Sequence, residues 1–290
     1  MPRLYVVATP IGNLSDISPR ALETLKNCAL IAAEDTRVTR ALLNHFGIDT
    51  PCVSNHQHNE ENRAAPLIER MLAEDIDVAV VTDAGTPCIS DPGSVLVHEA
   101  AQAGIEVLAV PGATAMASAL SVSGFDTREF AFYGFLPRQK KDLEEKLLSI
   151  AHSGVPIAVA HESPHRVIDL VRVIAATLPG CRISASCDLT KLHELTLRGS
   201  AAEVLAALRA NPKTEKGEYC LVLDFHGVEL PSAPAPAAEV SLEARLVEAM
   251  LQGNELRQAQ AVLVEAGEKK NAVKAAALRL KKLLQGEERP

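Results

Sequence analysis

The chain of 290 residues contains no tryptophan, and aromatic residues make up only 3% of it. Since apolar residues reach an ordinary 47%, the core must be built from alanine, valine, leucine and isoleucine. No apolar run approaches the roughly 20 residues that a membrane span needs, and "MPRLYVVATP" lacks the long apolar stretch of a signal peptide. We therefore expect a soluble, cytoplasmic protein with no membrane partner.

Cysteine spacing and net charge narrow the class of protein further. The six cysteines show no CxxC pair, and Cys28 and Cys220 lie in apolar stretches. This distribution favours the buried free thiols of a reducing compartment over disulfides or a metal site. The net charge of -8 argues against a protein that binds nucleic acid over its whole surface, although it leaves room for local basic patches.

The N-terminal part of the chain alternates apolar strand patterns with helical patterns. Ser18 and Pro19 mark the start of the first helix as N-cap and first helical position. Strands are predicted at 4–9, 28–34, 78–82 and 106–110. Strands separated by helices predict a parallel sheet covered on both faces, so residues 1–117 are expected to form an α/β domain.

The remainder of the chain divides into three further parts. Residues 118–228 begin with the aromatic strand pattern "EFAFYGFLP" and again alternate strands with helices, which predicts a second α/β domain. Residues 229–240 contain the Pro/Ala-rich stretch "LPSAPAPAAEV" and are expected to be a semi-rigid linker. Residues 241–290 are expected to form short helices without strands. The fold class is therefore α/β with a small C-terminal helical region.

Loops rich in glycine and small polar residues follow the apolar strands of the first domain. They are "TPIGN" (9–13), "TDAGTPCISDPG" (82–93) and "PGATA" (111–115). In open α/β sheets, ligands bind outside the carboxyl ends of the strands. One such loop alone is more simply a tight turn, but three of them after parallel strands predict a ligand site.

Within these loops, particular residues suit a ligand. Gly12, Gly85 and Gly112 would let the backbone approach it closely, and Asp83 is placed to accept hydrogen bonds. Asp91 followed by Pro92 is expected to cap and begin the next helix. The chain has neither a GxxxxGK[ST] phosphate loop nor a GxGxxG after its first strand. What remains is a nucleoside or amino-acid-like cofactor, recognised by backbone groups and a carboxylate.

Several stretches together resemble a known enzyme family. They are "TPIGNLSDISPRALETL", "AAEDTR", "SNHQHNE", "TDAGTPCISDPG", "VPGATA", "GFLPR", "HESPHR", "LTKLHE" and "KGEYCLV", in order from residue 4 to about 225. The chain resembles the tetrapyrrole-methylase-like, S-adenosylmethionine-dependent enzymes, and more closely their branch that 2′-O-methylates a cytidine ribose in 16S ribosomal RNA. "TPIGN" departs from the GxGxGD-like loop of the tetrapyrrole methylases proper, which favours the rRNA branch over a porphyrin-type substrate.

The resemblance implies two α/β domains with the S-adenosylmethionine cofactor in the cleft between them, and a homodimer. Carried over by position, the cofactor residues of the first domain are Pro10, Gly12, Asp83, Ala84, Gly85, Ser90, Ala113 and Thr114. Those of the second domain are Glu162, Leu189, Glu218 and Cys220. The implied partner is 16S rRNA or the small ribosomal subunit.

A ribose hydroxyl is a poor nucleophile, and a general base would accelerate its methylation by about 10²–10⁴-fold. The candidates for this base are Glu34, Asp35, Lys191 and Glu194. Arg37, beside the first two, is a candidate phosphate contact. Alternatively, Asp35 or Thr36 caps a helix and Arg37 pairs with a neighbouring carboxylate. The sequence does not decide between these.

Candidate RNA contacts lie in a polar loop and in two basic stretches. They are His56 and His58 in "SNHQHNE", Arg138, Lys140 and Lys141 in "PRQKK", and Lys269, Lys270 and Lys274 in "KKNAVKAAALRLKKLL". Each set has a plainer interpretation as a solvated surface. "HESPH" fits the zinc pattern HExxH, but Ser163 and Pro164 are expected to begin a helix after His161, so no zinc site is predicted.

Two other functions stay open at this point. One is a relative that methylates a small tetrapyrrole, against which "TPIGN" and the basic C-terminal stretch both argue. The other is a non-catalytic protein that binds RNA or the ribosome and keeps the cofactor fold. Cofactor binding without turnover would indicate the second.

Overall fold

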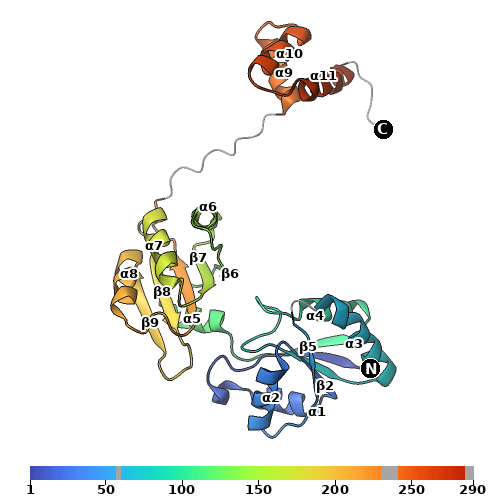
Figure 1. Ribbon diagram of the computed structural model, residues 1–290, viewed down its shortest axis with the longest axis vertical. Helices are drawn as coiled ribbons and strands as arrows, with labels where there is room; N and C mark the ends of the chain where they lie inside the picture. Colours follow the sequence, from blue (N-terminus) through green and yellow to red (C-terminus); the bar gives the residue numbers. More distant parts are fainter. Residues whose placement is uncertain (57–59, 230–240, 285–290) are drawn as a thin grey trace. The chain divides into compact units, whose positions relative to one another are not determined.

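A computed structural model describes residues 1–56, 60–229 and 241–284 of the chain (Figure 1). Its contacts divide the chain into two compact units, Met1–Leu230 and Pro231–Pro290. The six cysteines are free thiols, as predicted, and Cys28, Cys181, Cys187 and Cys220 are buried.

The first sheet is parallel, as the alternation of strands and helices predicts. Its strands are β1 (Arg3–Val7), β2 (Leu30–Ala33), β3 (Cys52–Ser54), β4 (Val78–Val81) and β5 (Glu106–Val110), in the order β3-β2-β4-β1-β5. β3 was not predicted, because it is three residues long and only half-buried. Because all these strands are parallel, the loops that follow them gather at one edge of the sheet.

Helices cover both faces of this sheet. They are α1 (Pro19–Asn27), α2 (Thr36–His45), α3 (Glu60–Glu74) and α4 (Ser94–Gln102), with a short 3-10 turn η1 (Leu14–Asp16) after β1. Leu25 and Leu43 of α1 and α2 pack in one apolar cluster, whereas Met71 and Leu96 of α3 and α4 pack in another. Ser18 caps α1 by accepting the N–H of residue 21, as predicted.

The second sheet is mixed rather than parallel. It contains β6 (Phe130–Phe135), β7 (Ile157–Glu162), β8 (Arg182–Cys187), β9 (Leu195–Ser200) and β10 (Tyr219–Asp224), in the order β6-β7-β10-β8-β9. Only β6 and β7 run parallel to each other, and the other neighbours are antiparallel. β9 was not predicted, because "LTLRGS" contains a glycine and an arginine and is only partly buried.

Helices also cover both faces of the second sheet. On one face, α6 (Lys140–Ala151), α7 (Val167–Thr177) and α8 (Ala201–Ala210) enclose the largest apolar cluster. On the other face, Ala119 and Leu120 of α5 (Ala115–Ser123) pack against Val159 and Val222. The expected domain boundary between residues 117 and 118 falls inside α5, a helix whose buried side belongs with the second sheet.

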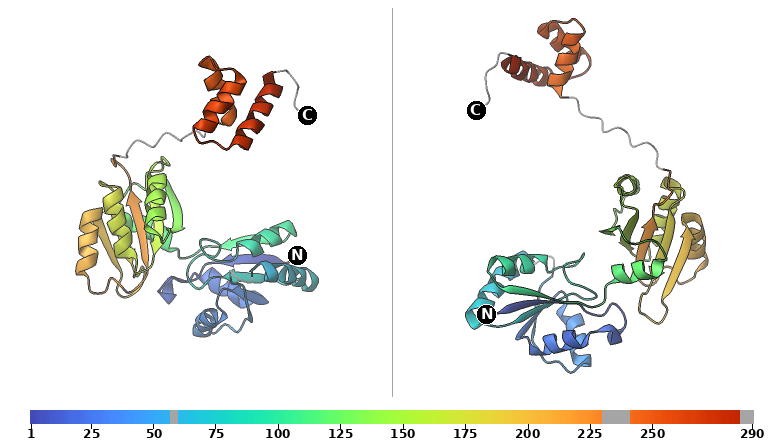
Figure 2. Two further views of the ribbon diagram at one scale, coloured as in Figure 1. Left: turned by 45° about the horizontal axis from the view of Figure 1, so that its top comes forward. Right: turned by 180° about the vertical axis from the view of Figure 1, so that it is seen from behind.

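The second unit is a bundle of three helices, α9 (Leu242–Leu251), α10 (Leu256–Glu265) and α11 (Lys270–Leu284) (Figure 2). Leu246, Leu263, Val273 and Leu280 form part of a core of its own. Within 241–284 there is no strand, which agrees with the expected helical region. The Pro/Ala-rich stretch 230–240 lies outside the described residues. None of the described helices combines the length and apolarity that a membrane crossing requires.

Candidate functional site

A cavity of about 400 Å³ lies at the carboxyl ends of the first sheet's strands and is closed by the second sheet. This volume is within the range of small-molecule and cofactor sites. Its lining consists of Ile11, Glu34, Thr82, Asp83, Ala84, Ile89, Ser90, Asp91, Ala115, Phe135, His161, Glu162, Ser163, Pro164, Leu189, Glu218, Tyr219 and Cys220. The loop 82–93 therefore supplies much of the wall on the side of the first sheet.

Most of the predicted cofactor residues line this cavity, namely Asp83, Ala84, Ser90, Glu162, Leu189, Glu218 and Cys220. The others lie beside it. Pro10 lines a neighbouring cavity of about 330 Å³ that shares Thr82 and Asp83 with the first. The carbonyl of Ala113 accepts a hydrogen bond from the Thr86 hydroxyl at 3.3 Å. Gly85 exchanges backbone hydrogen bonds with Thr9, Thr114 is the N-cap of α5, and Gly12 lies close to the side chain of Lys191.

The loop 82–93 has a strained backbone. Cys88 and Ser90 have φ values of 69° and 64°, a left-handed conformation that costs a residue with a side chain about 1–3 kcal/mol. Two backbone hydrogen bonds between Thr9 and Gly85, of 2.9 and 3.1 Å, tie the loop to the end of β1. Gly93, with φ of 128°, has no room for a side chain, since an added Cβ would lie 2.9 Å from the Cys88 sulfur. Such strain persists only where the surroundings fix it, as they do at functional sites.

The expected cap of α4 by Asp91 and Pro92 was wrong. The N-cap is Gly93, which has no side chain with which to form a capping bond. Instead, the buried carboxylate of Glu60, at the start of α3, accepts the N–H of Gly93 at 2.7 Å and that of Val95 at 3.0 Å. Because Glu60 satisfies these N–H groups, Asp91 is released from α4 and lines the cavity.

Three carboxylates meet on this wall with hydroxyl and backbone donors between them. Glu34 accepts hydrogen bonds from the Thr82 hydroxyl and, at 3.2 Å, from the N–H of Asp83. Burial raises the pKa of Asp83, and the charges of Glu34 and Asp35 raise it further. Burial also raises the pKa of Asp91 to about 6, again with the charges of Glu34 and Asp83 adding to the effect.

The opposite wall comes from β7. Glu162 is 2% exposed, its Oε1 accepts the N–H of Ser163 at 2.8 Å, and its Oε2 lies 3.1 Å from the Arg166 guanidinium. Burial raises the pKa of Glu162 despite these partners. Burial also lowers the pKa of His161, whose ring packs edge-on against Phe132 with centroids 5.1 Å apart. This wall therefore favours the neutral forms of its titratable groups.

Lys191 lies beside the cavity but not in its lining. Its Nζ is 2.8 Å from a Glu218 oxygen and 3.3 Å from an Asp188 oxygen. Burial lowers the pKa of Lys191, but the hydrogen bonds and charges of Glu218 and Asp188 outweigh this, so the pKa is raised. Gly12 packs on the same side chain, because an added Cβ would be 2.5 Å from the Lys191 Cγ. Lys191 is therefore a cation that is paired within the second domain and whose methylene groups lie against Gly12 of the first.

The other predicted catalytic residues hold local structure. Asp35 is the N-cap of α2, since it accepts the N–H of Arg37 at 2.8 Å, and it pairs with the Arg37 guanidinium at 2.6 Å. These hydrogen bonds lower the pKa of Asp35 to about 2. Glu194 accepts the N–H of Thr190 at 2.7 Å. Of the predicted set of Glu34, Asp35, Arg37 and Lys191, only Glu34 lines the cavity.

Apart from His56, which is half-buried, the predicted RNA contacts lie on exposed surfaces or outside the described residues. His58 is outside them, and His56 follows β3, where its carbonyl accepts the N–H of Glu60 at 3.0 Å. Arg138, Lys140 and Lys141 are exposed at the start of α6, and each lysine has a glutamate within 4 Å one turn along the helix. Lys269, Lys270 and Lys274 are exposed on or just before α11.

The HExxH stretch does not form the zinc-binding helix. His161 is within β7, and α7 begins only at Val167, so the expected cap by Ser163 and Pro164 was wrong. These residues form a turn instead, in which the carbonyl of Ser163 accepts the N–H of Arg166 at 3.1 Å. In the parts of the chain that the structure describes, no group of three or more histidine, cysteine, aspartate or glutamate side chains could hold a metal.

Sequence reasoning missed several residues of the lining, chiefly Thr82, Asp91, Phe135 and His161. Thr82 and Asp91 are next to the predicted residues Asp83 and Ser90, so extending the prediction along the same loop would have found them. Phe135 and His161 are register partners on β6 and β7. Their proximity depends on strand pairing, which composition and spacing do not reveal.

Comparisons with known proteins agree with this arrangement. Residues 3–205 match the family described as Tetrapyrrole (Corrin/Porphyrin) Methylases. A relative from Halalkalibacterium halodurans, named Ribosomal RNA small subunit methyltransferase I, is 46% identical over 224 residues, which cover 77% of this chain and 76% of the relative. A relative of the same name from Escherichia coli O157:H7 is 39% identical over 274 residues, covering 93% of each chain.

A solved structure supports the fold. Uroporphyrin-III C-methyl transferase from Thermus thermophilus, complexed with S-adenyl homocysteine, superimposes with a TM-score of 0.52 over 77% of this chain and 97% of that chain. At 17% identity this likeness concerns the fold alone, and it confirms the two α/β domains expected from the resemblance. The chain therefore belongs to the tetrapyrrole methylase family, and within it to the ribosomal RNA small subunit methyltransferase I group.

Proposed function

We propose that the protein is an S-adenosylmethionine-dependent methyltransferase that acts in the cytoplasm on 16S ribosomal RNA, at the 2′-hydroxyl of a cytidine ribose. The observation that carries this proposal is the membership of the chain in a group whose relatives are named small subunit rRNA methyltransferases. The cavity adds chemical support, since it combines backbone, carboxylate and apolar groups where the parallel strands end.

The cavity residues fit the cofactor. Its sulfonium and ammonium are cationic, and the lining supplies the carboxylates of Asp83 and Glu218. Ile89 and Leu189 supply apolar surface for a nucleobase. When bound, S-adenosylmethionine supplies an activated methyl group, so the protein mainly has to align this group with the attacking oxygen. Such alignment can contribute roughly 7–11 kcal/mol to catalysis.

The proposed cofactor contacts are the residues carried over from the family together with those that the cavity adds. On the side of the first sheet, Asp83 and Ser90 would contact the cofactor from a loop whose strained backbone is held by β1 and Glu60. On the other side, Leu189 and Cys220 would close the site. A loop fixed before the ligand arrives lowers the ordering cost of binding.

Contact with rRNA is proposed for the exposed cations Arg138, Lys140 and Lys141, for those on and just before α11, and for His56 and His58. α11 suits this role because it has basic residues and no acidic ones, while Val273 and Ala276 on its other side are buried in the bundle. Lysine neutralisation of phosphates supplies affinity without sequence preference. Groups near the cavity would then recognise the nucleobase.

A homodimer belongs to the same proposal. The small-residue helix α5 uses Ala119 and Leu120 within the chain but leaves Ala117, Ser121 and Val122 exposed, where a second copy would pack. Light scattering on the purified protein tests this point, and a mass of one chain at micromolar concentration would remove the dimer from the proposal.

The test of function is transfer of labelled methyl from S-adenosylmethionine to undermethylated 30S subunits, to naked 16S rRNA and to a tetrapyrrole precursor, followed by digestion to nucleosides. Label in a 2′-O-methylated cytidine from a ribosomal sample is the expected result. Label in the tetrapyrrole alone would overturn the substrate and leave the cofactor standing. Cofactor binding with no label in any sample would indicate the non-catalytic alternative.

A further inference from the structure

The lining of the cavity contains several carboxylates, and nearly all of them are already engaged. Glu34 accepts the Thr82 hydroxyl and the N–H of Asp83. Glu162 accepts the N–H of Ser163, and Glu218 pairs with Lys191. Each such hydrogen bond occupies part of the carboxylate's capacity to accept a proton from a ligand and opposes its protonation, although burial still raises the pKa of Glu162.

Asp83 is engaged as well, since its Oδ1 accepts the N–H of Asp35 at 3.1 Å. Asp91 differs from all of these. Among the described residues it forms no ion pair and caps no helix, and the hydroxyl beside its carboxylate, that of Thr82, donates its proton to Glu34. Asp91 is therefore the lining carboxylate with the most free capacity to accept a proton.

The position of Asp91 is fixed by the structure around it. Glu60 takes over the capping of α4, which leaves the Asp91 side chain to the cavity. The preceding residue, Ser90, is in the left-handed conformation and packs against β6, where a Cβ added to Gly134 would lie 2.8 Å from the Ser90 oxygen. A strained, tightly packed turn thus presents this one carboxylate to the ligand space.

The charged and titratable groups around Asp91 suit proton transfer near neutral pH. On the side of the first sheet they are Glu34 and Asp83, with Glu60 behind the loop. Across the cavity, the lining contains His161, Glu162 and Glu218. Burial and the two neighbouring carboxylates raise the pKa of Asp91 to about 6, so it is ionised at pH 7 yet more basic than an exposed aspartate.

We propose that Asp91 is the general base of the methyl transfer. This inference rests on the proposed function. The 2′-oxygen of the ribose forms a bond to the methyl carbon, the carbon–sulfur bond breaks, and its electron pair stays on sulfur as S-adenosylhomocysteine forms. The hydroxyl proton passes to the Asp91 carboxylate and then to water, which returns the residue to its ionised state.

The kinetic test compares Asp91→Asn with wild type in single turnovers on undermethylated 30S subunits at saturating cofactor. The rate should fall by about 10²–10⁴-fold, and Asp91→Glu should restore part of it. The matched control is Asp49→Asn, an exposed aspartate before β3 at the other edge of the first sheet, which should keep the wild-type rate. A variant rate within threefold of wild type would overturn the proposal.

Further readouts separate a base from a binding group or a folding defect. The wild-type rate should rise with pH through about 6, whereas the residual rate of Asp91→Asn should lose this step. Calorimetric affinity for S-adenosylmethionine should match wild type within threefold, and loss of affinity in proportion to rate would instead make Asp91 a cofactor ligand.

Carboxyl NMR of the free wild-type protein needs neither a substrate nor a variant that folds. It should show Asp91 titrating near pH 6, and titration near pH 4 would contradict the inference. If the wild type transfers no methyl at all, the proposed function has failed, and this titration still decides whether Asp91 is poised as a base.

Discussion

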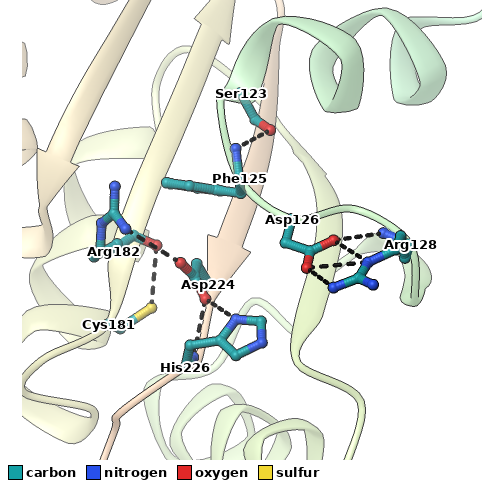
Figure 3. A network of polar contacts seen from close by, with 8 residues as sticks. All are labelled: Ser123, Phe125, Asp126, Arg128, Cys181, Arg182, Asp224 and His226. Carbon is teal, nitrogen blue, oxygen red and sulfur yellow. Dashed lines mark hydrogen bonds and ion pairs between the residues drawn. The ribbon is translucent and has the colours of Figure 1, made fainter.

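The two ends of strand β10 hold acidic side chains in opposite ways. At its start, beside Tyr219 and Cys220, the cavity wall includes Asp83 and Asp91, whose pKa values are raised by burial and by the charges of neighbouring carboxylates. At its end, buried Asp224 accepts the N–H and ring Nδ1 of His226 at 2.9 and 2.7 Å and lies 3.7 Å from the Arg182 guanidinium (Figure 3). The first end leaves Asp83 and Asp91 without an ion pair in the described structure, whereas the second end pairs Asp224 with a cation.

Other charged groups at the end of β10 follow the same rule. Asp126 forms hydrogen bonds with Arg128, which lower the pKa of Asp126 to about 2 (Figure 3). The Arg182 guanidinium also stacks on the Phe125 ring, 4.9 Å from its centre. Paired charges of this kind contribute little to stability at an exposed site, and they leave little capacity for a ligand. Carboxylates crowded together inside a cavity cost stability, and a cationic ligand relieves that cost.

The largest effect is expected from Asp83→Ala, beside the start of β10. Methyl transfer should fall by at least about 10²-fold, since a direct charged contact to the cofactor is worth about 1.5–3 kcal/mol and its geometry is disrupted as well. The melting temperature should stay within a few degrees of wild type, because the variant also relieves repulsion with Glu34 and Asp35. Full activity in this variant would remove Asp83 from the site.

Asp224→Ala removes the paired carboxylate at the other end of β10. It should reduce stability and leave methyl transfer unchanged, the opposite of what is expected for Asp83→Ala. Losing the hydrogen bonds to His226 should lower the free energy of unfolding by about 2 kcal/mol, measured by denaturant titration. Methyl transfer per folded molecule should not change, because Asp224 lies at the far end of β10 from the cavity. A large fall in turnover with unchanged stability would contradict the assignment of this end as structural.

The pH dependence of stability should carry a smaller signature of the crowded carboxylates. Asp91 has a pKa of about 6 in the folded chain, above the value of about 3.9 expected when unfolded. The folded state therefore holds more protons between pH 4 and 6, and stability should fall as the pH rises through this range. After allowance for solvent screening, Asp91→Asn should remove at most about 1 kcal/mol of this fall. Unchanged pH dependence in the variant would show that Asp91 titrates as an ordinary exposed aspartate.

The smallest effect is expected from the exposed lysines near α11, where cations with and without an ion pair can be compared. On α11, Arg279 pairs with Glu243 at 2.6 Å, whereas the described structure gives no ion pair to the exposed Lys269, Lys270, Lys274, Lys281 and Lys282. Changing these five lysines to glutamine should reduce the salt dependence of RNA affinity by about 0.7–0.9 in log–log slope for each phosphate that is no longer neutralised. Lys26→Gln with Lys213→Gln is the control, and an unchanged slope in the quintuple variant would exclude α11 from the interface.

Much of this arrangement is predictable from the sequence because it depends on local pattern. Apolar runs such as "VAVV" indicate the buried strands, and Ser18 with Pro19 indicates a helix start through geometry that neighbouring residues decide. The loops after the strands indicate the cavity, since parallel strands bring their carboxyl ends together.

The rest depends on contacts between distant residues. Asp91 with Pro92 has the sequence of a helix cap, but Glu60, far earlier in the chain, takes that role, and only the fold shows it. Lys191 is a residue type that can act as a general base, but its ammonium group pairs with Glu218 and Asp188, and the sequence does not show these contacts. Short, partly buried strands such as β3 and β9 gain their structure from their neighbours rather than from their own residues.

The central claim is that the crowded carboxylates form the cofactor site, and calorimetric titration of S-adenosylmethionine tests it most directly. Wild type and Asp224→Ala are expected to bind with the same affinity, whereas Asp83→Ala should bind at least about tenfold more weakly. Equal binding by Asp83→Ala, together with weakened binding by Asp224→Ala, would contradict the account and move the cofactor site to the other end of β10.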